Sequence, residues 1–130
     1  MAISFRVMGY IFIGGALGSM ARYLIFELSN STFRNAIAEL ITLSVVNIAG
    51  AYFLGLANKH PYFQSVFCKN IWAVGFAGGF TTMSGVTLFM AMENFDSWIW
   101  LMLGIGFIAY RFGLRHGRNF AKKESELELS

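Results

Sequence analysis

Four long apolar stretches constrain the fold of this chain more than any other feature of its sequence. They cover residues 7–26, 40–57, 70–92 and 98–114. Each is close to the ~20 residues with which an α-helix crosses ~30 Å of hydrocarbon, where a segment must satisfy its own backbone hydrogen bonds. The strands of a β-barrel would alternate apolar and polar residues, whereas these stretches are apolar on all sides. We therefore expect an all-α integral membrane protein with four transmembrane helices.

The polar residues lie between and after these stretches. Charged residues make up 13% of the chain, against about 25% in a typical soluble domain. The short links leave no room for a second domain, so residues 1–130 are expected to form one four-helix unit. A polar tail, residues 115–130, is expected to extend the last helix and to fray. The sequence contains no cluster of metal ligands, no nucleophile–base pair and no phosphate-binding loop, so we expect no enzyme.

The cations are distributed unevenly between the two sides of the predicted bundle. With four spans, both termini lie on one side, and that side carries eight of the ten Lys and Arg residues: Arg6, Lys59, Lys69, Arg111, Arg115, Arg118, Lys122 and Lys123. The other side carries Arg22 and Arg34. Because cytoplasmic segments are enriched in Lys and Arg, both termini are expected in the cytoplasm. The basic run after the last span is interpreted as an orientation signal or a contact with anionic lipid, and not as a nucleic-acid site.

The third apolar stretch contains an unusual concentration of glycine and hydroxyl residues at its centre. It reads Gly75-Phe76-Ala77-Gly78-Gly79-Phe80-Thr81-Thr82-Met83-Ser84-Gly85-Val86. Glycine weakens a helix, and hydroxyl groups compete for its backbone hydrogen bonds. The pattern predicts a broken third helix, with a kinked packing helix as the alternative. Non-helical backbone at this depth has to be buried in protein or to line a cavity, where carbonyl groups can bind a cation and hydroxyl groups an anion.

Two further polar residues lie inside predicted spans. Asn47 is near the centre of the second span, and Arg22 lies towards the end of the first. The Asn47 amide is expected either to bond a neighbouring helix or to donate to a passing anion. Arg22 is expected either to extend to the interface or to attract anions into a water-filled vestibule.

Three motifs in order resemble the Fluc (CrcB) family of fluoride channels. The first is Gly14-Gly15-Ala16-Leu17-Gly18 with Arg22-Tyr23, and the second is Val46-Asn47-Ile48-Ala49-Gly50 with Leu54-Gly55. The third, Gly75 to Ser84, is similar to the family signature Gly-Phe-x-Gly-Gly-x-Thr-Thr-Phe-Ser. The resemblance spans nearly the whole chain. It implies a subunit that assembles as an antiparallel dimer and exports fluoride passively through the cell membrane.

The resemblance also implies roles for particular residues. Arg22, Asn47, Thr82 and Ser84 would lie on the fluoride pathway. The backbone carbonyls of Gly78 and Thr81 would bind a structural sodium ion at the dimer interface.

The sequence departs from the family pattern at the pore. Met83 and Val86 stand where the family has two pore-lining phenylalanines. Trp98 and Met102 stand near the positions where the family has a pore tyrosine and a pore serine in the fourth helix, and neither residue is equivalent to them. A homodimer of opposed subunits requires little charge bias, whereas this chain is strongly biased. We therefore expect a heterodimer with a homologous subunit, in which one pore is degenerate.

Two other functions stay open from the sequence. One is a non-conducting structural subunit of such a channel. The other is a small multidrug-resistance-type transporter, which would require a carboxylate deep in the first span. Glu27 lies at the end of that span and Glu39 before the next, which argues against proton-coupled export.

Overall fold

The computed structural model describes residues 4–33, 35–93 and 96–129, which are helical apart from short connections. The helices are α1 (Phe5–Thr32), α2 (Asn35–Lys59), η1 (Pro61–Gln64), α3 (Val66–Cys68), η2 (Lys69–Phe76), α4 (Ala77–Phe80), α5 (Met83–Glu93) and α6 (Asp96–Glu128). Within these described residues, four segments are long and apolar enough to cross a membrane: Phe5–Thr32, Ile37–Lys59, Val66–Leu88 and Ser97–Glu128. The chain is a multi-pass membrane protein, as its four apolar stretches predict.

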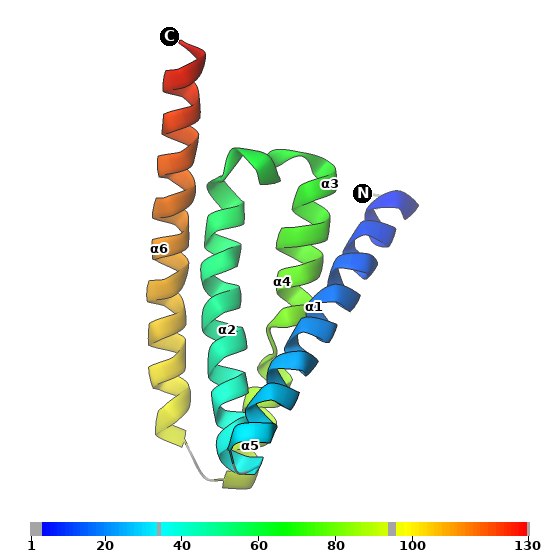
Figure 1. Cartoon of the computed structure of the whole chain (residues 1–130), viewed down its shortest axis with the longest axis vertical. Helices are drawn as coiled ribbons and strands as arrows, with labels where there is room; N and C mark the ends of the chain where they lie inside the picture. Colours follow the sequence, from blue (N-terminus) through cyan, green and yellow to red (C-terminus); the bar gives the residue numbers. More distant parts are fainter. Residues whose placement is uncertain (1–3, 34, 94–95, 130) are drawn as a thin grey trace.

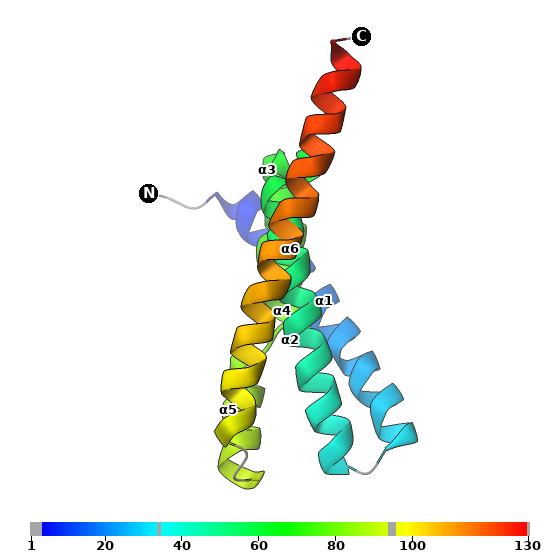
Figure 2. The same cartoon turned by 90° about the vertical axis from the view of Figure 1, so that its left-hand side faces the viewer.

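The start of α1, the end of α2 and the end of α6 lie at the same end of the bundle (Figure 1). At the opposite end, the lower halves of α1 and α2 diverge from α5 and the first turns of α6 (Figure 2). Three of the eight cations of the predicted terminal side, Arg6, Lys59 and Lys69, lie close to helix ends, and the other five lie on α6 from Arg111 onwards. Arg34 lies outside the described residues.

Helix α6 extends well beyond the predicted fourth span and continues as far as Glu128. Ala, Lys and Glu in this extension are strong helix formers. Lys122 and Glu126, one turn apart, also form an ion pair of 3.7 Å, which adds a small stabilisation. The predicted polar tail is therefore helical through Glu128.

The third span is broken, as the sequence predicts. Its first half is formed by α3, η2 and α4, and η2 is wound as a π-helix. Thr81 then leaves the helix with φ −78° and ψ 156°, an extended conformation, and α5 begins at Met83 in a new direction (Figure 1). The break falls at the centre of the glycine and hydroxyl segment.

Glycines allow α1 to approach the third span at backbone distance. A methyl group added to Gly14 would collide with the Ile71 carbonyl, one on Gly18 with the Phe76 carbonyl, and one on Gly79 with the Gly15 carbonyl. Small residues permit such close helix contacts within a bilayer. We call this contact the α1 glycine seam.

A second glycine seam joins α2 and α6. Added methyl groups at Gly55 and Gly113 would collide with the carbonyls of Tyr110 and Tyr52. At Gly104 and Gly106, nearer the start of α6, no atom of the described residues lies within 4 Å of an added methyl group.

A small apolar cluster lies between α2, α5 and α6. Leu43, Val86 and Met102 are buried there and pack together, with Leu40, Trp98 and Ile99 around them. This cluster sets the position of α5 after the break.

Candidate functional site

The Asn47 side chain of α2 is paired with the backbone at the break in the third span. Its amide oxygen accepts a hydrogen bond from the Thr82 N–H at 2.9 Å. Its amide nitrogen donates to the Thr82 carbonyl at 3.2 Å and to the Leu43 carbonyl at 2.9 Å. Of the two expectations for Asn47, this geometry matches a bond to a neighbouring helix, because both amide protons already have acceptors.

Side-chain hydrogen bonds at the break leave two backbone carbonyls without their regular donors. In a continuous helix the Thr82 N–H would donate to Gly78, and the Gly85 N–H to Thr81. The first donates to Asn47 instead, and the second to the Thr82 hydroxyl at 3.1 Å. The carbonyls of Gly78 and Thr81 have therefore lost their regular helical donors. An Arg22 N–H lies 3.5 Å from the Thr81 carbonyl oxygen, which retains a second lone pair.

Two cavities flank the break. The larger, of about 450 Å³, is lined by residues of α1, α2, α5 and the break, and we call it the Arg22 cavity. The smaller, of about 230 Å³, is lined by Asn47, Gly50, Ala51, Leu54, Ala77, Gly78 and Thr81, and we call it the Asn47 cavity. The six residues predicted to contact fluoride or sodium thus line one of two cavities on either side of the break.

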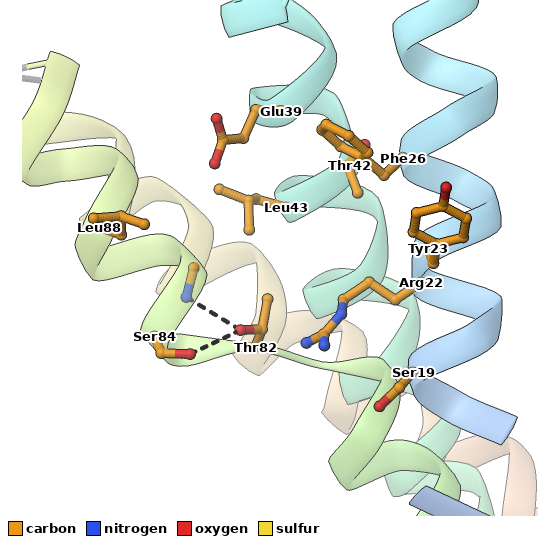
Figure 3. Close-up of a pocket in the computed structure, with 11 residues that line it drawn as sticks. Ser19, Arg22, Tyr23, Phe26, Glu39, Thr42, Leu43, Thr82, Ser84 and Leu88 are labelled. Carbon is orange, nitrogen blue, oxygen red and sulfur yellow. Dashed lines mark hydrogen bonds between the residues drawn. The ribbon is translucent and has the colours of Figure 1, made fainter. Parts of the chain in front are cut away.

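The Arg22 cavity brings together a cation, two hydroxyl groups and a helix N-terminus. The Arg22 side chain extends towards Thr82 and Ser84 (Figure 3). The two hydroxyl oxygens are 3.3 Å apart, and Thr82 caps the N-terminus of α5 through its bond to the Gly85 N–H. A helix N-terminus carries a partial positive charge and favours anions. This end of the cavity therefore presents positive charge and hydroxyl donors.

Glu39 is a cavity residue that the sequence analysis missed. Its carboxylate lies at the end of the Arg22 cavity away from Ser84 (Figure 3). The sequence analysis put Glu39 just before the second span, but α2 begins at Asn35, which brings Glu39 into the helix. The sequence did carry a signal for this residue, because the Glu39 carboxylate lies one residue before the predicted second span.

The two substituted pore positions have different surroundings. Met83 is 56% exposed, whereas Val86 is 1% exposed and packs within the subunit. Met102, near the expected fourth-helix pore residues, is buried in the same cluster. In this chain, Val86 and Met102 thus contribute to an apolar contact between helices.

Comparison with known proteins identifies the family. Residues 9–114 match the family model described as CrcB-like protein, Camphor Resistance (CrcB). The chain belongs to the CrcB family. This confirms the family resemblance, and it leaves the small multidrug-resistance-type alternative without support.

Several curated relatives are named as fluoride-specific ion channels. FluC of Solibacter usitatus is 34% identical over 118 residues, covering 79% of this chain and 91% of the relative. FluC of Gloeothece citriformis is 43% identical over 82 residues, covering 57% and 60% respectively. FluC 2 of Corynebacterium jeikeium is 30% identical over 139 aligned positions, covering 84% and 78%. The match thus spans about three-fifths of the Gloeothece relative. No solved structure matches the chain.

Proposed function

We propose that this CrcB-family chain is a subunit of a channel that lets fluoride leave the cytoplasm passively across the cell membrane. The main support is the convergence of Arg22, Thr82 and Ser84 at one end of a cavity beside the broken third span. The relatives named as fluoride-specific ion channels support the same choice of ion. Fluoride enters acidified cells as a neutral weak acid and ionises inside, so a passive exit for the anion relieves its accumulation.

The residues of the Arg22 cavity suit a small, strongly hydrated anion. Arg22 raises the local anion concentration. The hydroxyls of Thr82 and Ser84 can donate hydrogen bonds in place of water as the anion sheds its hydration shell. Asn47 then acts as a positioning residue, because its pairing with Thr82 holds the break open.

A sodium ion fits the Asn47 cavity by its donor chemistry. The carbonyls of Gly78 and Thr81 would hold it, since neither has its regular helical donor and backbone carbonyls bind hard cations. Gly78 is exposed, and in the described part of the chain no atom lies within 4 Å of a methyl group added there. This open surface leaves room for a second subunit. When bound, the ion would offset the repulsion between carbonyl oxygens that face each other across a subunit interface.

We further propose that the chain pairs with an inverted homologous subunit and inserts with both termini in the cytoplasm. The concentration of cations at one end of the bundle supports a single orientation. The numbered name FluC 2 supports the idea that one genome can encode two homologous subunits. The apolar packing of Val86 with Met102 supports one degenerate pore, with the partner supplying the aromatic residues.

Fluoride resistance tests the proposed function. A fluoride-sensitive bacterial strain without its own channel is transformed with this chain alone, with its homologous subunit alone, and with both. Growth at fluoride concentrations that stop the parent strain is expected when both are expressed. Full resistance from this chain alone would overturn the obligate pairing, and sensitivity in every strain with verified membrane expression would overturn the channel function.

A non-conducting subunit is the second candidate, and the buried position of Val86 favours it. Arg22→Gln and Ser84→Ala in this chain, within the paired complex, separate the two functions. Reduced fluoride flux indicates that this chain lines a conducting pathway. Unchanged flux indicates that the partner conducts alone.

A further inference from the structure

Three arginines lie along one exposed face of α6. Arg111, Arg115 and Arg118 are spaced at i, i+4 and i+7, which places them on one side of a helix. Together with Ile108, Phe112 and Leu114 they line a hollow of about 400 Å³. We call this surface the arginine face.

The arginine face points away from the rest of the subunit. Gly113 and Gly117 pack against α2. At about 100° per residue, Arg111 and Arg115 lie roughly 160° around the helix from Gly113. Their guanidinium groups therefore face the surroundings of the subunit, and all three arginines are exposed.

The packing of α6 on α2 also fixes the height of this face in the membrane. A methyl group on Gly117 would meet the Leu56 carbonyl and the His60 nitrogen, so Gly117 is level with the end of the second span. Arg115 and Arg118 flank it, and Arg111 lies about 6 Å nearer the membrane centre than Arg115, at ~1.5 Å per residue. This is the level at which phospholipid headgroups meet the hydrocarbon.

The charge on the arginine face has no carboxylate partner nearby in its helix. No Asp or Glu occurs between Asp96 and Glu124, and Glu126 pairs with Lys122 further along. Phe112 lies beside the arginines and is 56% exposed, and Ile108, one turn nearer the membrane centre, is 54% exposed. Arginines beside an apolar strip that continues towards the membrane centre are complementary to an anionic headgroup above an acyl chain.

We propose that the arginine face binds an anionic phospholipid of the phosphatidylglycerol type. The guanidinium groups bind the phosphodiester through charge-assisted hydrogen bonds, for which their planar geometry is well suited. One acyl chain lies along Ile108 and Phe112. This site is separate from both cavities at the break and does not depend on which ion the protein conducts.

Lipid binding is measured on the full protein in nanodiscs, where both membrane faces are accessible and insertion direction has no influence. Exchange of a fluorescent phosphatidylglycerol is compared with that of the matching phosphatidylcholine. The test variant is Arg111→Gln/Arg115→Gln/Arg118→Gln. The control variant, Lys59→Gln/Lys69→Gln/Lys123→Gln, removes three exposed cations from the same end of the chain. Circular dichroism checks that both variants remain helical. If the triple arginine variant loses its helical structure, the single variant Arg115→Gln replaces it.

The wild type and the lysine control are expected to prefer phosphatidylglycerol over phosphatidylcholine. In the arginine variant this preference is expected to be at least about tenfold smaller. The single variant should lose severalfold. Retained preference in the arginine variants, or an equal loss in the lysine control, would overturn the site. Displacement of the lipid by millimolar inorganic phosphate would assign the face to free phosphate. Protection of the face by a second subunit, detected as loss of binding on dimer formation, would also overturn the proposal.

Discussion

The Asn47 side chain pairs with both backbone groups of Thr82, through hydrogen bonds of 2.9 and 3.2 Å that join the second span to the break in the third. An asparagine amide carries a donor and an acceptor in the same arrangement as a peptide group, so it can replace the hydrogen bonds that a broken helix loses. One side chain thus stabilises the extended backbone and releases the Gly78 carbonyl.

Replacing Asn47 is expected to destabilise the protein. Asn47→Ala leaves the Thr82 N–H and carbonyl without these partners in a half-buried site, at a cost of about 1–3 kcal/mol. Thermal unfolding in detergent, followed by circular dichroism, measures the effect. Asn58→Ala is the matched control, because it removes an exposed hydrogen bond of 3.0 Å to Tyr110. Equal effects of the two substitutions would contradict the role given to Asn47.

The α1 glycine seam should tolerate no added side-chain atoms. Gly18→Ala and Gly79→Ala introduce methyl groups that collide with backbone, and overpacking of this kind costs about 1–3 kcal/mol. Gly104→Ala meets no atom within 4 Å among the residues that the structure describes and should be neutral or slightly stabilising, because alanine favours a helix. Unfolding midpoints of the three variants measure the difference. A destabilised Gly104→Ala beside an unchanged Gly79→Ala would disprove the packing.

Much of the fold could be predicted from the sequence, because membrane spans are encoded by length and apolarity alone. The break was predictable too, because Gly78, Gly79, Thr81 and Thr82 each weaken a helix at the same place. Which glycines of the last helix make contacts was not predictable. Gly113 packs and Gly104 does not, and this depends on the rotation of α6 against α2.

Part of the candidate site could also be predicted from the sequence. Arg22, Asn47 and Thr82 are costly inside a membrane and are therefore recognisable from the sequence. The surroundings of Val86 and Glu39 depend on the direction that α5 takes after the break and on where α2 begins. The direction of α5 is a tertiary property that the local pattern of residues does not express, and α2 begins at Asn35, before the apolar stretch that predicts the second span.

Opposite charges in the Arg22 cavity should have opposite effects on fluoride flux. At ~6–10 Å in a water-like medium, one charge changes the local anion concentration about two- to threefold. Arg22→Gln should lower flux by about this factor at low ionic strength, and Glu39→Gln should raise it. Both effects should shrink in about 1 M salt as charges are screened. Efflux that is independent of salt in both variants would contradict an electrostatic role for these residues.

Gly78 provides a test of the proposed sodium site. The added methyl group of Gly78→Ala has no atom of the described residues within 4 Å, so the substitution should leave the isolated chain folded. If this surface faces a second subunit around an ion, the added methyl group should weaken the dimer. Wild-type dimer stability should rise with NaCl and not with KCl at equal ionic strength, because binding stabilises the bound state. A dimer unaffected by both the substitution and the cation would argue against the site.

Fluoride efflux from liposomes is the most direct test of this chain as a channel subunit. Liposomes loaded with potassium fluoride contain the chain alone, its homologous partner alone, or both, and a fluoride electrode follows release after addition of a potassium ionophore. We predict rapid fluoride efflux from liposomes with both subunits, with no matching chloride efflux. Fluoride release at the rate of protein-free liposomes, from the chain alone and from the pair, would contradict the account.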